Sequence, residues 1–203
     1  MHPLHIKLFR ELRRLWAQAA AIALVMAAGV ATLIIGIGTY QSLAQTRTYY
    51  YESNRFADIF ASVSRATRTV LRELAEIDGV LAVDGRITKV ALADIEGIPE
   101  PASVLLVSLP ERSGGDLNRL YMRSGRLPES GHGVEAVVSE IFAKANRFVP
   151  GSHLGVILNG ALREISIAGI ALSPEYIYAM APGEIMPNES RFGVLWVPER
   201  EHP

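Results

Sequence analysis

Residues 153–172 read HLGVILNGALREISIAGIAL, two strand-like runs separated by the dipeptide Asn159-Gly160. Asn and Gly tolerate positive φ, which a two-residue type I′ turn needs at both of its central positions. This is the clearest turn signal in the chain. The stretch therefore predicts a β-hairpin with Asn159 and Gly160 at its tip, and with it an antiparallel sheet.

Further strand-like segments lie on both sides of the hairpin. They cover residues 57–64, 80–92, 103–109, 134–139 and 192–198. Turn-forming residues, among them Gly125, Pro128 and Gly131, shape the loops between these segments. Strands in this number, interrupted by short helices, predict an α+β domain with a mixed, largely antiparallel sheet.

Two helices are expected between the strands. In the first, Val70, Leu71, Leu74 and Ile77 fall on one face, with Ser64 as the N-cap and Gly79 as the C′ residue. The second covers SEIFAKANRF, residues 139–148, and is expected to turn Ile141, Phe142 and Ala145 inward. One or both helices should pack on a face of the sheet.

A long apolar run precedes this domain. Residues 17–38 read AQAAAIALVMAAGVATLIIGIG, with only Gln18 and Thr32 as polar interruptions. As an α-helix the run would extend roughly 33 Å, about the thickness of the hydrocarbon core of a bilayer. The alternative is a signal peptide cleaved before Gln45, but the apolar regions of signal peptides span only about 7 to 15 residues. The run therefore predicts an uncleaved transmembrane helix.

Basic residues set the expected orientation of that helix. Lys7, Arg10, Arg13 and Arg14 precede it, whereas mixed charges follow it, so the positive-inside rule places the N-terminus in the cytoplasm. The external domain would then be periplasmic or extracellular, on a protein of the bacterial inner membrane. The predicted organisation is an amphipathic interfacial helix over 1–16, a transmembrane helix over 17–40, a helical stalk over 41–56, the external domain over 57–198 and a tail over 199–203.

Small residues recur along the predicted membrane helix. They are Ala19, Ala23, Ala27 and Ala31, with Gly36 on a neighbouring stripe. Small side chains at this spacing allow a second helix to approach closely. The alternative is that alanine is simply common in bacterial membrane helices. These five residues are the predicted packing surface for another membrane helix.

Enzymatic chemistry has little support in the sequence. There is no G-x-x-x-x-G-K-[ST] loop for phosphates, no H-E-x-x-H zinc motif and no G-x-S-x-G elbow. Ser130 and His132 lie close together, but in a glycine-containing loop that would seldom orient them for proton transfer. Arg126 and Glu135 are expected to form a surface pair or to fix the loop. We therefore predict no catalytic, cofactor-binding or metal-binding residues.

Composition restricts the partners as well. The chain has no cysteine, which excludes disulfides and thiolate metal sites, and its formal net charge is −1. The charge of about −4 that remains after the basic N-terminus offers no surface for nucleic acid. The lipid bilayer is the partner that the residues themselves indicate.

The order of several phrases resembles a known family. LRELAEIDGVLAVD, MRSGRLPE, EAVVSEIFAKA, PGSHLGVILNG and ISIAGIALSPEYIY follow the membrane helix in this order. The chain resembles the N-terminal part of FtsX-like ABC transporter permeases, and more narrowly their MacB-like periplasmic core domain, over roughly residues 4 to 198. At Ser152 the family pattern often has Asp.

The resemblance implies a non-catalytic permease component. In such proteins a cytoplasmic ATPase drives the membrane helices, and the periplasmic domain transmits this motion for export or mechanotransmission. Family members carry further membrane helices after the periplasmic domain, so the resemblance implies a fragment, a truncated product or half of a split permease. The expected partners are an ABC ATPase subunit and the remaining permease helices or a second permease copy. The alternative is a single-pass sensor or adaptor with a periplasmic binding domain.

Overall fold

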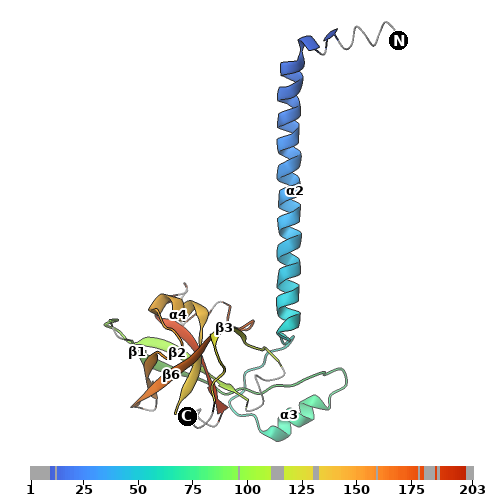
Figure 1. Ribbon diagram of the computed structural model, residues 1–203. Coiled ribbons are helices and arrows are strands. Elements are labelled where there is room, and N and C mark those ends of the chain that lie inside the picture. Colours follow the sequence, from blue (N-terminus) through green and yellow to red (C-terminus); the bar gives the residue numbers. More distant parts are fainter. Residues whose placement is uncertain are drawn as a thin grey trace. The chain divides into compact units, whose positions relative to one another are not determined.

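The computed structural model describes residues 10, 11, 13–95, 97–110, 117–129, 133–158, 160–177, 179, 180, 186 and 188–199. The chain divides into two compact units, Met1–Tyr49 and Tyr50–Pro203. Figure 1 shows the chain from a long N-terminal helix, in blue, to the last strand of a sheet, in red.

The first unit consists mainly of helix α2, Trp16–Ser53, whose last turn from Tyr50 onward belongs to the second unit. None of its residues is buried. The hydroxyl of Thr32 donates to the carbonyl of Ala28 at 2.9 Å, so this polar side chain is satisfied within the helix. The helix continues through most of the predicted stalk. Most of the predicted interfacial helix, including Leu4, Leu8 and Leu12, lies outside the described residues.

The sheet of the second unit closes on itself. Its strands are β1 (Thr88–Asp94), β2 (Ala102–Leu109), β3 (Tyr121–Gly125), β4 (Glu135–Ser139), β5 (His153–Leu158), β6 (Ala161–Leu172) and β7 (Phe192–Pro198). Their order is β3-β6-β4-β7-β2-β1-β5, and β5 also pairs with β6. The strands therefore form a closed ring, in the order β6, β4, β7, β2, β1, β5 and back to β6. Strand β3 lies beside β6 outside this ring.

The pairing is mixed, as the sequence predicts. Among the described strands, β2–β7 and β4–β6 are parallel, whereas the other five pairings are antiparallel. Strand β6 takes part in three of these pairings because it is long enough for two neighbours along its length. Its first half pairs with β5, and its second half pairs with β3 and β4.

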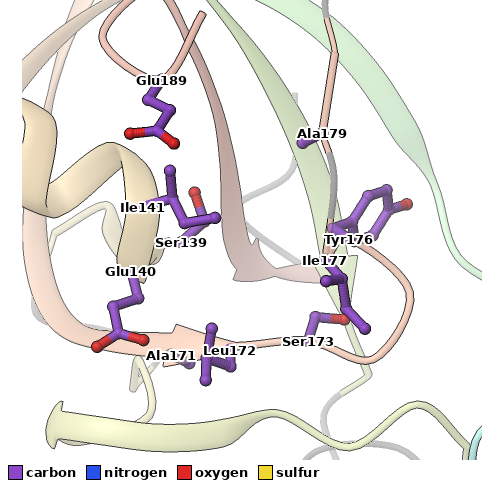
Figure 2. A pocket seen from close by; sticks show the side chains of 10 residues that line it. All are labelled: Ser139, Glu140, Ile141, Ala171, Leu172, Ser173, Tyr176, Ile177, Ala179 and Glu189. Atoms are coloured by element: carbon purple, nitrogen blue, oxygen red, sulfur yellow. The ribbon is translucent and has the colours of Figure 1, made fainter. Parts of the chain in front are cut away.

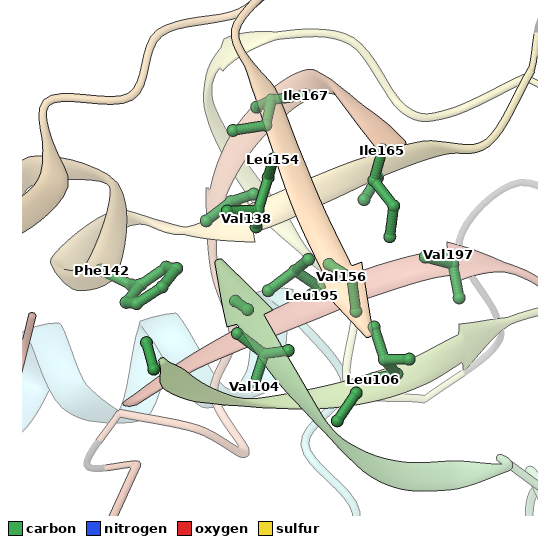
Figure 3. Close-up of a cluster of buried hydrophobic side chains, with 14 of the residues drawn as sticks. Val104, Leu106, Val138, Phe142, Leu154, Val156, Ile165, Ile167, Leu195 and Val197 are labelled. Atoms are coloured by element: carbon green, nitrogen blue, oxygen red, sulfur yellow. The ribbon is translucent and has the colours of Figure 1, made fainter. Parts of the chain in front are cut away.

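Alternating side chains of the ring fill its interior. Ala102, Val104 and Leu106 of β2 meet Leu154 and Val156 of β5 in one buried cluster. Figure 3 shows Val104 and Leu106 converging with Leu154 and Val156. Because successive residues of a strand point to opposite faces, every second residue of β2 enters this core. The ring is therefore a packed barrel.

A second apolar cluster lies on the other face of the central strands. It contains Val107, Val137, Val194 and Trp196, and the half-buried Tyr176 packs against it. The rings of Tyr176 and Trp196 meet edge to face, with centroids 6.1 Å apart. All seven residues of β7 are consequently buried.

Helix α4, Glu140–Asn146, closes the core with one aromatic side chain. Phe142 is only 1% exposed, and Figure 3 shows its ring directed from α4 towards the strands. A Cβ at Gly193 of β7 would overlap this ring, so β7 needs glycine there. The prediction of the inward face was partly wrong. Ala143 is buried beside Phe142, whereas Ile141 and Ala145 are exposed.

The segment before the barrel differs most from the prediction. Residues 57–64 form no strand, and helix α3 covers only Arg68–Ala75, with Thr67 and not Ser64 as its N-cap. The Thr67 side chain accepts a hydrogen bond from the Val70 amide at 3.4 Å. Gly79 has positive φ but lies three residues beyond the C-cap Glu76. The strand predicted over 80–92 begins only at Thr88.

The predicted hairpin is present, with β5 and β6 pairing up to Leu158 and Ala161. Gly160 has a φ of +79°, as the turn requires, while Asn159 lies outside the described residues. The last strand has the predicted bounds of 192–198. Strand β3 was not predicted, because its residues YMRSG are mostly polar and exposed.

Helix α2 ends in a Schellman motif. The Phe56 amide donates to the Tyr51 carbonyl at 2.9 Å and the Arg55 amide to the Glu52 carbonyl at 3.1 Å. Arg55 adopts the left-handed conformation that this motif needs, with a φ of +49°. The rings of Tyr51 and Phe56 lie 4.7 Å apart and supply the hydrophobic contact that often accompanies the motif.

Candidate functional site

The loop after β3 is held by a buried carboxylate. Arg126 donates to both oxygens of Glu135, through Nη1 and Nη2, at 2.7 Å each. Glu135 also accepts a hydrogen bond from the Glu129 amide at 3.0 Å. The hydrogen bond to Glu135 raises the pKa of Arg126. This arrangement fixes the loop, one of the two roles expected for the pair, although Glu135 itself is buried.

The structure offers no catalytic arrangement around this pair in the part of the chain it describes. Ser130 and His132, considered as a nucleophile and a base, lie outside the described residues. The described residues contain no group of three or more His, Cys, Asp or Glu side chains that could hold a metal ion. The bidentate ion pair also occupies both oxygens of Glu135. Among the described residues, the contacts of Arg126 and Glu129 with Glu135 hold the loop in place.

A small hollow lies beside α4. Its cavity volume is about 70 Å³, and it is bordered by Ile141, Ala171, Leu172, Tyr176 and Ile177, among others. Figure 2 shows Glu140 and Ile141 on one side and Tyr176 and Ile177 on the other. Burial raises the pKa of the Tyr176 phenol, and the nearby Glu175 raises it further. The hollow is large enough for one apolar side chain or a few water molecules, and too small for most cofactors.

Glu140 at the edge of the hollow is paired with two cations. Its Oε1 lies 2.8 Å from Lys144 Nζ and 3.2 Å from Arg123 Nε. The hydrogen bond from Lys144 lowers the pKa of Glu140 below its ordinary value of 4.5, desolvation opposes this, and Arg123 contributes to the lowering. A carboxyl whose pKa is lower in the folded state stabilises that state above its unfolded pKa. The stabilisation is lost as the pH falls below 4.5 and through the lowered folded pKa.

This linkage gives a prediction for Lys144→Gln. At pH 6 the variant should be less stable than the wild type by up to about 1 kcal/mol, a small effect because the Lys144 side chain is 72% exposed. The difference should shrink as Glu140 becomes protonated towards about pH 3. Urea denaturation at a series of pH values measures it. Arg72→Gln, which removes one positive charge from α3, is the control. A difference that is as large at pH 3 as at pH 6 would contradict the assignment.

Helix α2 carries the other candidate surface. One window of this helix has a mean hydropathy of 2.5, and by length and composition the helix could cross a membrane. The small residues Ala19, Ala23, Ala27 and Ala31 lie within it and are exposed. A Cβ at Gly36 would meet nothing within 4 Å. The surface is thus open to another helix, and its use for packing stays a prediction.

Comparison with known proteins finds several solved structures that are similar to part of this chain, and two of them are described below. No family model and no curated protein matches the chain. The first structure is the extracellular domain of YknZ, a noncanonic ABC-type transporter of Gram-positive bacteria. It is 17% identical, with a TM-score of 0.43, over 72% of this chain and 71% of that domain.

The second structure is the periplasmic region of MacB from Actinobacillus actinomycetemcomitans. It is 15% identical, with a TM-score of 0.40, over 67% of this chain and 56% of that region. Both structures are regions that lie outside the cytoplasm.

Proposed function

We propose that this chain is a component of an ABC-type permease of the FtsX/MacB kind, which couples a cytoplasmic ATPase to export or to mechanotransmission. Helix α2 anchors it in the inner membrane, and the barrel works outside the cytoplasm. The observation that carries the proposal is the length of α2, Trp16–Ser53, which ends within the unit that contains the barrel. A helix of this length extends well beyond the roughly 30 Å of the hydrocarbon core.

The ordered sequence phrases that resemble the family support the same function. Helix α2 is the one candidate membrane helix among the described residues, and a single helix cannot enclose a transport path, which needs several helices or a closed barrel in the bilayer. The chain would therefore act together with further permease helices or a second permease copy, and with an ABC ATPase subunit.

An exposed apolar segment favours a second candidate, a membrane-anchored sensor or adaptor. Large apolar side chains of the second unit are exposed at Ile59, Phe60, Val63, Val70, Leu74 and Ile77. So many exposed apolar residues in one segment are typical of a surface that another molecule covers. A sensor or adaptor would bind that molecule without any ATPase.

Purification from native membranes distinguishes the two candidates. The tagged chain is extracted in a mild detergent, and the proteins bound to it are identified and quantified. The permease function predicts a Walker-motif ATPase in stoichiometric amounts, whose ATP hydrolysis depends on the presence of the chain. Recovery of a periplasmic partner without any ATPase would favour the sensor or adaptor.

The small-residue surface of α2 gives a prediction for the same preparation. Ala23→Leu with Ala27→Leu should lower the yield of co-purified membrane partners about tenfold, because larger side chains keep the helices apart. The control is Ala17→Leu with Ala21→Leu, which adds the same bulk roughly 120° around the helix, away from the stripe of Ala19, Ala23, Ala27 and Ala31. Equal yields from both double variants would show that this surface does not pack against a partner.

Orientation is tested by labelling a single cysteine. The natural chain has no cysteine, and Ser62 is exposed, so Ser62→Cys creates one accessible thiol. In intact cells with a permeabilised outer membrane, a membrane-impermeant maleimide should label this thiol to more than about 80% of the level reached in lysed cells. Labelling only after lysis would place the domain in the cytoplasm.

A further inference from the structure

The chain leaving α2 is attached to the barrel by a small group of polar contacts. The Arg119 amide donates to the Asn54 carbonyl at 2.8 Å, and the Asn118 amide donates to the Arg55 carbonyl at 2.9 Å. The side-chain oxygen of Asn118 accepts a hydrogen bond from the Ala57 amide at 3.0 Å. Asn54 and Asn118 are both buried. Residues 54–57 and 117–119 thus form a two-stranded contact just ahead of β3.

Arg86 connects this contact to the rest of the second unit. Its Nη2 donates to the carbonyl of Leu117 at 2.6 Å and to that of Asn118 at 3.4 Å. Its Nη1 pairs with Glu175, in the loop after β6, at 3.2 Å. The Arg86 side chain is only 10% exposed, so these bonds are largely shielded from water.

The backbone of Ile87, the residue after Arg86, is hydrogen-bonded to the barrel. The Ile87 amide donates to the hydroxyl of Ser108 in β2 at 2.8 Å, and the Ser108 amide donates to the Ile87 carbonyl at 2.9 Å. Ser108 itself is buried. Arg86 therefore extends from the edge of the barrel to the turn that receives the end of α2.

The backbone at this contact is unfavourable. Arg55 and Asn118 both have a φ of +49°, a left-handed conformation that residues with a side chain rarely adopt. Such residues persist only where their surroundings hold them, and they gather at switch regions. Here the Asn118 amide donates directly to the Arg55 carbonyl, so this contact and the Schellman motif that ends α2 share the left-handed Arg55.

The barrel is stabilised separately from this contact. Its core is the apolar cluster of the ring strands, which contains none of Asn54, Arg55, Arg86 or Asn118. The intervening helix α3 adds little, because none of its residues is buried. Regions with few buried apolar contacts open locally at a lower free energy than the core does. This contact can therefore open before the barrel unfolds.

From these observations we infer that Asn54, Arg55, Asn118 and Arg119 form a latch that holds the end of α2 on the barrel. Arg86 is its positioning residue, and the latch opens while the barrel stays folded. The inference concerns the chain alone and does not depend on an ATPase or on transport.

Hydrogen–deuterium exchange on the full chain in detergent micelles tests the latch. In Arg86→Gln the amides of Asn118 and Arg119 should exchange about tenfold faster or more, because charged hydrogen bonds to the turn are lost. The peptide covering β2, residues 102–109, should exchange at the wild-type rate. Unchanged exchange at 118 and 119 would overturn the inference, and so would an equal acceleration over β2.

Three further variants complete the experiment. Arg191→Gln is the control, because Arg191 pairs with Glu100 and takes no part in the latch. Glu175→Gln keeps Arg86 but removes the negative charge that faces it, so it should accelerate the same amides by a smaller factor even if Arg86→Gln fails to fold. In Arg86→Gln combined with Arg55→Gly, exchange should be slower than in Arg86→Gln, because glycine adopts the left-handed backbone readily. No slowing would overturn the role of the strained backbone.

Discussion

Phe142→Ala should destabilise the barrel by about 3–5 kcal/mol. The ring of Phe142 is buried at 1% exposure among the interior side chains of the barrel. Gly193 leaves room for the ring, and Ala143, the other buried side chain of α4, is only a methyl group. Truncation to alanine would remove most of the apolar surface that α4 buries and would leave a cavity at this point.

Tryptophan fluorescence in a urea titration can measure this loss. The chain has two tryptophans, so a Trp16→Phe background leaves Trp196, which is fully buried, as the reporter of the barrel. Ile141→Ala is the matched control, because Ile141 precedes Phe142 on the same helix but is 39% exposed. The control should cost about 1 kcal/mol or less. Equal losses in the two variants would contradict the orientation of α4.

Gly125→Ala should destabilise the barrel by about 3 kcal/mol or more. Gly125 has a φ of +74° and pairs with Gly169 of β6 at the end of β3. A Cβ at this position would overlap the carbonyl oxygen of Ala168 and would approach the Cα of Gly169 at 2.7 Å. Both are backbone atoms, so the overlap cannot be relieved by rotating a side chain, and β3 would separate from β6.

Gly160→Ala is the control for Gly125→Ala. Gly160 has a similar φ of +79°, but a Cβ there would meet nothing within 4 Å. Its substitution should therefore cost only the unfavourable left-handed backbone, about 1–2 kcal/mol. The difference between the two variants isolates the steric overlap. If the free energy of unfolding falls by the same amount in both variants, the close packing of β3 against β6 at Gly125 is contradicted.

Local signals in the sequence predicted a large part of the barrel. The hairpin of β5 and β6 follows from Asn159-Gly160, and β2, β4 and β7 are apolar runs of the length of a strand. Closure of the ring could not be predicted in this way. It depends on the parallel register of β2 with β7, in which Ser103 faces Phe192 far along the chain. No local pattern encodes such a pairing.

The errors have physical causes too. Residues 57–64 have the composition of a strand, but a strand needs a neighbour to satisfy its backbone, and in the structure none pairs with them. Ile59 is 86% exposed in consequence. Strand β3 was missed for the opposite reason, since its pairing with β6 holds a mostly polar stretch in the sheet.

The candidate site was predictable only in part. The proximity of Arg126 and Glu135 in the sequence suggested their pairing, but not the burial of Glu135. The end of α2 carries no sequence signal, because Arg55 stands at the left-handed position of the Schellman motif, where glycine is the usual residue. The role of Arg86 could not be predicted from the sequence, because its hydrogen-bond partners Leu117, Asn118 and Glu175 lie far away along the chain.

Closure of the ring restricts how another protein can recognise this domain. Many domains bind extended peptides by adding a strand to an open sheet edge. In the part of the chain that the structure describes, short edges without a neighbour remain on the outer side of β3, at the start of β1 before Leu92, and on one side of the first half of β6. The first of these is short and irregular between Met122 and Ser124. A peptide bound at these edges would form few main-chain hydrogen bonds with the domain, so its specificity must come from side chains. A scrambled peptide of equal β-propensity should therefore not compete with it for binding.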